Sequence, residues 1–352
     1  MIPVVDLSRR SAPDRDAWLA RAEAILRDGR LLLGPELEGL EHELAAWSGH
    51  AHAVAVASGA AAIQLALAAL GIGPGDEVVV PALTAVPTAS AVCATGAVPV
   101  IADVDALTAA LDPGEAAAAV TDRTRAVVPV HLYGRPAPRP DIGVPVVEDA
   151  AQAHGAVDAS GSAATAYSFY PTKNLGGIGD GGAVVTDDAG LAAHIRRLRV
   201  HGMTEQYVHT DVSQNFRISE LEAAWLRITL PGLAAANERR RTIAAAYAAA
   251  APALRWHADH PRHVRHLCVV RVADRERFRA ALADRGVGTG VHYPLPVHRQ
   301  PAYAHLARHP CPNAEAWAAE CVSVPCFPEL TDAEVDTVCA ALAATAGEGY
   351  AL

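Results

Sequence analysis

Residues 52–81 read HAVAVASGAAAIQLALAALGIGPGDEVVVP, and this stretch decides the expected fold class. It begins with a short apolar run at 52–57, which predicts a strand. Ser58 and Gly59 then turn the chain into a helix rich in alanine and leucine, and the valines at 78–80 belong to a second strand. The order of strand, tight turn, helix and strand predicts one βαβ unit.

The same alternation continues along the following seventy residues. Segments 90–97 and 112–120 have helical patterns, while segments 98–104 and 125–134 and the valines before Glu148 predict strands. Such alternation predicts a mostly parallel sheet covered by helices on both faces, with ligands at the carboxyl ends of the strands. We therefore expect the functional positions to meet at one rim of the sheet, namely Ser58, Pro81 to Thr88, His131 to Gly134, and Glu148 to Gln152.

Helical patterns flank this α/β region. The first fifty residues have apolar side chains at helical spacing, interrupted at Gly34 and Pro35. An irregular stretch is expected over residues 203–217, followed by a long helical region over about residues 219–250. These flanking segments are therefore expected to be mainly helical.

The last hundred residues return to an α/β pattern. They contain one strand and two helices, at residues 264–272, 274–286 and 333–346. We therefore predict a large domain over residues 1–240 and a smaller α/β domain over residues 241–352. No segment rich in serine and glycine separates the two, which indicates a hinge between them and not a flexible tether.

Charge and cysteine content limit the partners. The chain has 29 basic and 39 acidic residues, a net charge of −10, and no basic run, so we expect neither nucleic acid nor an anionic membrane as a partner. Its six cysteines are scattered without paired spacing, which predicts free thiols in a reducing compartment and no metal site. The N-terminus lacks a signal-peptide pattern, and we expect a cytoplasmic protein.

The segment YSFYPTKNLGGIGDGGAVVT, residues 167–186, places Lys173 before five glycines within residues 176–182. A phosphate loop has its glycines after a strand and at the start of a helix, but here the glycines precede the strand-like run AVVT. They are therefore interpreted as the bend of a β-hairpin. The lysine follows an apolar strand, where partial burial favours loss of its proton and allows Schiff-base formation with an aldehyde. An exposed loop lysine is the alternative.

Two further features favour pyridoxal phosphate as the aldehyde. Asp149 ends a run of valines, where a carboxylate requires a positive partner such as the protonated pyridine nitrogen, although an N-cap aspartate is the alternative. The backbone amides after Ser58 open a helix and are suited to bind a phosphate, although a simple helix cap is the alternative. The order of phosphate turn, carboxylate and lysine along successive strand ends supports the cofactor interpretation.

These residues belong to longer blocks that resemble the DegT/DnrJ/EryC1/StrS family of pyridoxal-phosphate-dependent sugar aminotransferases, which have the aspartate aminotransferase fold (fold type I). The blocks include GPGDEVVVPALT, PVHLYGRP, VVEDAAQAHGA, SFYPTKNLGGIGDGGAVVT, NFRISELEAAWL and GTGVHYPLPVH. The resemblance extends over almost the whole chain. It implies a large domain with a mostly parallel, seven-stranded type of sheet between helices, and a smaller C-terminal α/β domain.

The resemblance also implies roles for individual residues. Lys173 would form the Schiff base and move the proton, Asp149 would face the pyridine nitrogen, and Gln152 would lie near the phenolic oxygen. The phosphate would be held by Gly59 and Ala60 with Ser168 of the same subunit and Asn215 of a neighbouring subunit, which implies a homodimer. Positions around the substrate opening are matched by His131, Tyr133, Arg217, His292 and Tyr293.

The chain departs from the family pattern beside the expected cofactor. Ala60 replaces a frequent threonine, so only its backbone donor remains for the phosphate. Leu83 and Ala85 stand where the family usually has an aromatic residue or histidine against the cofactor ring, so an aliphatic contact or another side chain must replace that stacking. The segment before the lysine strand, AVDASGSAATAYSF, is also shorter than usual.

The expected reaction is a ping-pong amino transfer. L-Glutamate or L-glutamine would supply the amino group, Lys173 would act as general base and acid, and a nucleotide-linked keto-deoxysugar would accept the amine. A cyclitol ketone of the inosose type is the alternative acceptor, and a cofactor-binding protein without turnover is the alternative function. Sugar 3-dehydratases of the family carry histidine in place of the lysine, so Lys173 argues against that class. A biosynthetic pathway for an antibiotic or a surface glycan is expected.

Overall fold

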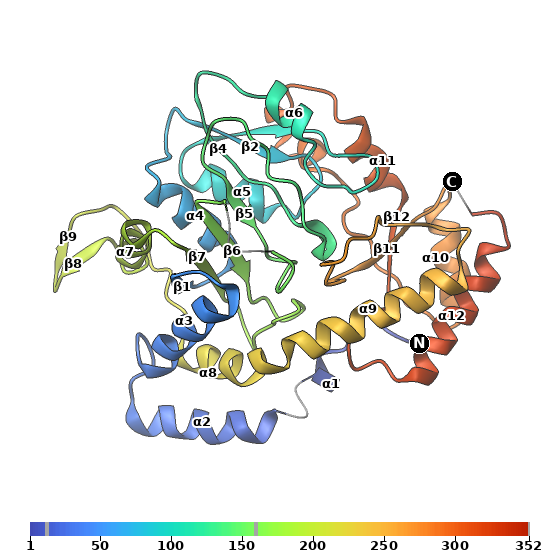
Figure 1. Cartoon of the computed structure of the whole chain (residues 1–352), viewed down its shortest axis with the longest axis horizontal. Helices are drawn as coiled ribbons and strands as arrows, with labels where there is room; N and C mark the ends of the chain where they lie inside the picture. Colours follow the sequence, from blue (N-terminus) through green and yellow to red (C-terminus); the bar gives the residue numbers. More distant parts are fainter. Residues whose placement is uncertain (11–13, 158–160, 351–352) are drawn as a thin grey trace.

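The computed structural model describes residues 1–10, 14–157 and 161–350. Figure 1 shows an elongated molecule with a sheet-containing body at one end and a second α/β region at the other. Both termini lie on the side of this second region. None of the helices in these described residues is long and apolar enough to cross a membrane.

A central sheet forms the body. Four of its strands lie in the order β1 (His52–Val56), β7 (Gly182–Thr186), β6 (Ala164–Ser168) and β5 (Val147–Asp149). Three more lie in the order β4 (Thr124–Val127), β2 (Glu77–Pro81) and β3 (Val98–Ala102). Parallel bridges from Val127 to Val146 and from Val130 to Asp149 join the two sets. Only β7 runs antiparallel to its neighbours, so the described strands confirm the mostly parallel, seven-stranded sheet.

Helices cover both faces of this sheet, and the side chains on both faces of its strands are therefore buried. Along β1, Val54 and Val56 pack in the core beneath α4 (Gly59–Ala69), while Ala53 and Ala55 pack on the opposite side beneath α3 (Pro35–Ser48). The first face also carries α5 (Pro87–Ala94) and α7 (Ala189–Leu198). On the second face α3 contacts α8 (Glu220–Thr229), which in turn contacts α2 (Arg15–Asp28).

A buried carboxylate joins two helices on this second face. Glu220 begins α8, and its oxygens accept hydrogen bonds from the backbone amides of Gly34, Glu36 and Leu37 at 2.8, 2.8 and 3.2 Å. These amides belong to the first turn of α3, where no intrahelical acceptor is available and Gly34 has no side chain to cap them. The break expected at Gly34 and Pro35 is therefore the capped start of α3.

The C-terminal region has its own antiparallel sheet and core. It follows α9 (Leu233–Ala250) and contains β10 (Arg255–Trp256), β11 (Cys268–Arg271) and β12 (Cys321–Val324), with α10 (Arg275–Asp284), α11 (Pro312–Glu320) and α12 (Asp332–Ala346). Its apolar core also includes Ile2 from the N-terminal segment. Ile2 donates its amide to the carbonyl of Gly286 and accepts a bond from the amide of Gly288. The division at residue 240 remains a prediction.

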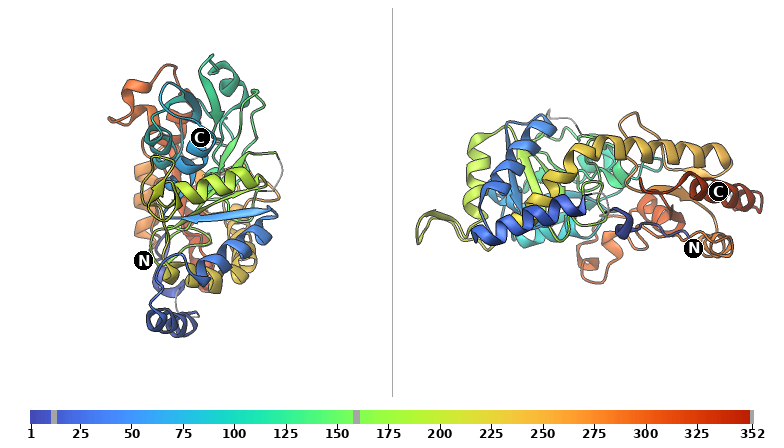
Figure 2. Two further views of the ribbon diagram at one scale, coloured as in Figure 1. Left: turned by 90° about the vertical axis from the view of Figure 1, so that its left-hand side faces the viewer. Right: turned by 90° about the horizontal axis from the view of Figure 1, so that it is seen from below.

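Three local expectations were wrong. The stretch at 203–217 is not wholly irregular, because β8 (Met203–Glu205) and β9 (Val208–His209) form a hairpin that projects from the body (Figures 1 and 2). The strand expected at 125–134 ends at Val127, and a short 3₁₀ turn, η1 (Leu132–Gly134), follows it. Lys173 lies five residues beyond the end of β6, in a loop and not at a strand terminus.

Candidate active site

The loop between β6 and β7, residues 169–181, positions Lys173. Backbone bonds close it: the amide of Lys173 donates to Tyr170 at 2.8 Å, and the amide of Gly177 donates to Phe169 at 2.7 Å. A Cβ on Gly176 would lie 2.3 Å from the carbonyl oxygen of Pro171, so this glycine is required by close packing. Because β6 and β7 are antiparallel partners, the loop is a long hairpin connection, as expected, and it does not open a helix.

Side chains from distant parts of the sequence hold this loop. The guanidinium group of Arg10, at the end of α1 (Leu7–Arg10), donates to the carbonyls of Pro171, Lys173 and Asn174 at 2.7, 2.8 and 2.9 Å. Burial lowers the pKa of Arg10 to about 10. Sequence reasoning missed Arg10, because no local pattern connects an N-terminal arginine with a loop 160 residues later.

Asn174 anchors the other side of the lysine loop. Its side-chain amide donates to Asn237 Oδ1 at 2.8 Å and to the carbonyl of Val264 at 3.1 Å. Its oxygen accepts from His266 Nδ1 at 3.1 Å, which leaves Nε2 of the neutral ring as an acceptor. The loop is therefore tied to α9 and to the segment before β11 as well as to the N-terminal segment.

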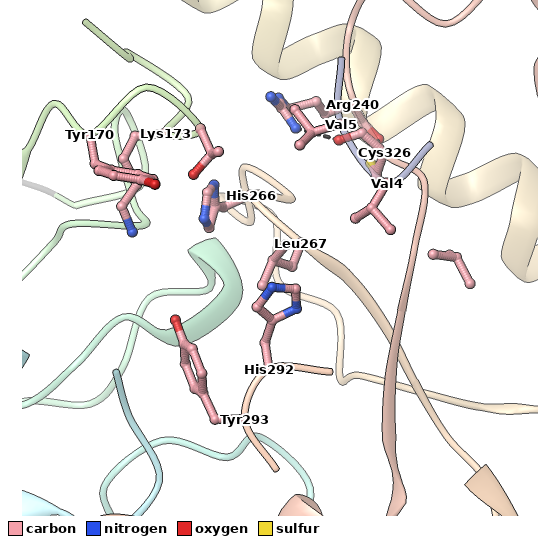
Figure 3. Close-up of a pocket in the computed structure, with 12 residues that line it drawn as sticks. Val4, Val5, Tyr170, Lys173, Arg240, His266, Leu267, His292, Tyr293 and Cys326 are labelled. Atoms are coloured by element: carbon pink, nitrogen blue, oxygen red, sulfur yellow. Dashed lines mark hydrogen bonds between the residues drawn. The ribbon is translucent and has the colours of Figure 1, made fainter. Parts of the chain in front are cut away.

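Two cavities meet at Lys173. The first, the sheet-edge cavity, has a volume of about 260 Å³ and lies at the carboxyl ends of the strands. The second, the N-segment cavity, has a volume of about 340 Å³ and reaches Val4 and Val5. Lys173 and Tyr170 line both. Figure 3 shows these two side chains together on one side of the N-segment cavity.

Lys173 has the electrostatic properties of a reactive amine. Its side chain is partly exposed where it faces the cavities, but the surrounding protein desolvates the ammonium group and lowers its pKa to about 8. The carboxylate of Asp149 opposes this shift. A larger fraction of the amine is therefore neutral near physiological pH than for a lysine in water, which suits it for attack on a carbonyl carbon.

Asp149 faces the sheet-edge cavity and is only 6% exposed. One oxygen accepts from the Thr88 hydroxyl at 2.7 Å and the other from the amide of Ala151 at 3.0 Å, while Thr88 also bonds the Thr84 hydroxyl at 2.9 Å. Within the described residues no arginine, lysine or histidine forms an ion pair with it. A buried carboxylate without a cationic partner is costly, so its environment fits a protonated ring nitrogen in the cavity.

The start of α4 forms an anion cradle at the same cavity. Ser58 accepts from the amide of Ala61 at 3.0 Å, and the preceding amides of Gly59 and Ala60 open the helix without intrahelical partners. A Cβ on Gly59 would lie 2.6 Å from the Cβ of Ser168, and one on Gly182 would lie 2.4 Å from the carbonyl of Ser58. The glycines therefore let the helix terminus approach β6 and β7, which fits a bound phosphate.

Gln152 connects the two cavities. Its oxygen accepts from the amide of Tyr133 at 2.6 Å, and its amide nitrogen donates to the hydroxyl of Tyr293 at 3.1 Å. Tyr293 and His292 line the N-segment cavity, while Gln152 lines the sheet-edge cavity. Burial raises the pKa of the Tyr293 hydroxyl to about 12, so it stays protonated.

Five of the expected site residues line neither cavity. Leu83 is fully buried in the core, and its neighbour Ala85 lines the sheet-edge cavity instead. His131 and Tyr133 are also buried: His131 lies 3.3 Å from the carboxylate of Glu148, and the hydroxyl of Tyr133 donates to the carbonyl of His292 at 2.5 Å.

Asn215 and Arg217 lie on the segment after the β8–β9 hairpin. Arg217 Nε donates to Asn215 Oδ1 at 2.8 Å, and Asn215 is exposed. They are outside both cavities of their own chain. The residues that do line the cavities as expected are Ser58, Gly59, Ala60, Asp149, Gln152, Ser168, Lys173, His292 and Tyr293.

Comparison with known proteins identifies the family to which this arrangement belongs. The DegT/DnrJ/EryC1/StrS aminotransferase family matches residues 14–343. The chain belongs to this family. It is therefore an aminotransferase, and the family is dependent on pyridoxal phosphate, which fits the anion cradle and the Asp149 carboxylate without an ion-pair partner described above.

Two named family relatives match over nearly their full lengths. The dTDP-3-amino-3,4,6-trideoxy-alpha-D-glucose transaminase of Streptomyces venezuelae is 45% identical over 351 residues, covering 94% of this chain and 92% of the relative. The UDP-N-acetyl-3-dehydro-alpha-D-glucosamine 3-aminotransferase of Acidithiobacillus ferrooxidans is 41% identical over 360 residues, covering 95% of each. The crystal structure of S. venezuelae DesV in complex with a ketimine intermediate superposes with a TM-score of 0.93 at 43% identity, covering 98% of each chain.

Proposed function

We propose that this aminotransferase transfers an amino group from L-glutamate or L-glutamine to a nucleotide-linked keto-deoxysugar. The observation that carries the proposal is the meeting of Lys173, with its lowered pKa, and Asp149, without an ion-pair partner, at one cavity. The two named relatives are transaminases of nucleotide-linked sugars, one with dTDP and one with UDP. This supports the sugar acceptor over a cyclitol ketone and over a protein without turnover.

The roles of the cavity residues follow from their chemistry. Pyridoxal phosphate supplies an aldehyde and an electron-withdrawing ring. Lys173 Nζ would hold the cofactor through that aldehyde, and the same amine would act as the base and acid that removes and returns the proton at the reacting carbon. Asp149 would keep the ring nitrogen protonated, and Gln152 would donate to the phenolic oxygen. The amides of Gly59 and Ala60, with the Ser168 hydroxyl, would hold the phosphate.

The faces of the cofactor ring require a different contact from the aromatic stacking usual in the family. The sheet-edge cavity is lined on its apolar sides by Ile63, Ala85, Pro87 and Val130. We assign the ring contact to these aliphatic side chains, with Ala85 in the position expected for the aromatic residue. Leu83 contributes only through the core behind them.

We also propose that the active enzyme is a homodimer with shared active sites. Close to Lys173, Tyr170 is 52% and Ile178 is 46% exposed, and on or beside the projecting hairpin Tyr207 is 84% exposed and Val212 is fully exposed. Large exposed apolar side chains around a site favour a protein interface. A partner's copy of this hairpin segment would bring Asn215 to the phosphate and Arg217 to the sugar opening. Roles for His131 and Tyr133 are then indirect, since both are buried.

The proposed setting is the cytoplasm, in a biosynthetic pathway such as one that makes an antibiotic or a surface glycan. The test of the function uses purified protein with cofactor, whose absorption spectrum is recorded before and after L-glutamate and L-glutamine are added separately. We expect a visible band that is lost as the cofactor takes up the amine. Keto-sugar nucleotides and an inosose are then added, and amination is followed by mass spectrometry. A band that never changes with either donor would refute the proposed function.

A further inference from the structure

The N-segment cavity has an unusual balance of charge. Its lining includes the basic side chains of Lys173 and Arg240, the rings of His266 and His292, and no aspartate or glutamate. The sheet-edge cavity, by contrast, is lined by Asp149 and Asp180. An anionic ligand is therefore favoured on the N-segment side of Lys173 and disfavoured, apart from the phosphate at the helix terminus, on the other.

Arg240 is the decisive residue of this cavity. It lies on α9 and is only 5% exposed, yet among the described residues no carboxylate lies within ion-pair distance of it. It donates one hydrogen bond to the carbonyl of Cys326, and its Nε has no partner. Glu329 attracts it only at longer range, and burial lowers the pKa of the guanidinium group. A buried arginine in this state is poised for a carboxylate, which guanidinium binds through two parallel hydrogen bonds.

The position of His266 adds a second feature. Figure 3 shows its ring between Lys173 and Arg240. Burial lowers the pKa of the ring well below its usual value, and the positive charges of Lys173 and Arg240 lower it further. Because its Nδ1 donates to Asn174, its Nε2 is a hydrogen-bond acceptor. The cavity thus offers a cation for a carboxylate at one end and an acceptor for an N–H group nearer the lysine.

We propose that the N-segment cavity is the site of the amino-acid donor, and that Arg240 binds a carboxylate of that donor. This inference rests on the proposed aminotransferase function. The volume of about 340 Å³ lies at the lower end of the range for small-molecule sites, which suits an amino acid and not a whole nucleotide-linked sugar. Because Lys173 lines both cavities, the amine of a donor held in the N-segment cavity would lie on the Lys173 side, next to the sheet-edge cavity where the cofactor would bind.

The first test measures binding without any reaction. Glutarate, a dicarboxylate that has no amine, is titrated calorimetrically into the cofactor-loaded protein, with neutral glutaramide as the comparison ligand. We expect glutarate to bind and glutaramide not to bind. Arg240→Met should weaken glutarate binding at least about tenfold, as expected for the loss of a charged hydrogen-bonded pair, while Arg240→Lys should retain part of it. Arg241→Met, which removes the neighbouring, partly exposed arginine outside this cavity, is the matched control and should bind normally.

The second test separates this inference from the proposed function. In the spectroscopic half-reaction with L-glutamate, Arg240→Met should raise the L-glutamate concentration at half-saturation at least about tenfold. The rate of the second half-reaction, in which the amine-loaded enzyme aminates a keto-sugar, should stay near that of the unaltered enzyme. If Arg240→Met does not fold, Val5→Trp fills the cavity from its exposed edge and should weaken glutarate binding instead. Normal glutarate affinity in the folded variants would overturn the assignment, whereas absence of any half-reaction in the unaltered protein would overturn the function.

Discussion

The carboxyl group of Glu222 provides a quantitative test of how the lysine hairpin is built. Glu222 lies on α8 and is only 4% exposed, with its Oε1 unpaired beneath the glycines that follow Lys173. A Cβ on Gly177 would lie 1.4 Å from this oxygen, so the loop closes directly over the carboxyl group. Burial raises its pKa from 4.5 to about 7, a shift that hydrogen bonds from the amides of Ile178 and Gly179 oppose and the charge of Asp180 increases.

The sign of the resulting effect on stability follows from linkage. Because the pKa is raised on folding, the neutral form is favoured in the folded protein, and its contribution is fully present below about pH 4.5. It is lost as the pH rises through about 7. A shift from 4.5 to about 7, at about 1.4 kcal/mol per pKa unit, corresponds to at most about 3.5 kcal/mol of unfolding free energy above pH 8.

The perturbation is Glu222→Gln, which keeps the shape and removes the ionisation. Urea unfolding at about pH 5 and about pH 8.5 should show similar free energies for the two proteins at the lower pH, and a gain for the variant of up to about 3.5 kcal/mol at the higher pH. Glu23→Gln, on the exposed face of α2, controls for loss of a surface carboxylate. Parallel pH profiles for the unaltered protein and Glu222→Gln would refute the reasoning.

Four further outcomes are expected. Lys173→Ala should fold, since it removes a desolvated amine, but should form no covalent cofactor adduct on borohydride treatment and show no turnover; undiminished turnover would contradict its role. Asp149→Asn should retain cofactor weakly by dialysis and lose transamination by orders of magnitude, and comparable activity would show that the ring needs no carboxylate. Arg10→Met leaves three loop carbonyls without their donor and should lower the unfolding free energy by about 2 kcal/mol or more, with unchanged urea midpoints arguing against the contact. His257 is buried between Thr108 and His263, and burial lowers its pKa to about 3. The neutral ring therefore contributes to the unfolding free energy above pH 6.5, and this contribution should be lost as the pH falls toward 3. The unfolding free energy of His257→Gln should fall less over the same pH range.

Local sequence pattern predicted much of the fold and most of the candidate site residues that line the two cavities. The strand and helix order over residues 52–102 is visible because apolar periodicity is a property of neighbouring residues. Asp149 could be recognised as a candidate because a carboxylate ends a run of valines, and Lys173 because a lysine stands between an apolar stretch and five glycines. The glycines after Lys173 were interpretable as a hairpin because the strand-like run lies after them and not before.

Contacts between distant segments could not be predicted in this way. The choice between Leu83 and Ala85 at the cavity depends on which way the chain turns after β2, and the two positions are too close in sequence for a pattern to separate them. Arg10 reaches the lysine loop only because Ile2 pairs beside Gly286 and draws the N-terminal segment across the molecule. Neither Arg10 nor Ile2 carries a local sequence pattern that indicates its role.

The sequence alone determined the fold class and the order of the strands and helices over residues 52–102, and it singled out Lys173 and Asp149 as candidate site residues, since these follow from short-range periodicity and from the energetic cost of burying charge. Only the tertiary structure decided the surroundings of that lysine. The lowered pKa of Lys173, and the lack of an ion-pair partner for Asp149 and for Arg240 among the described residues, depend on desolvation and on which groups lie within a few ångströms. Those distances are set by packing among segments far apart in the chain.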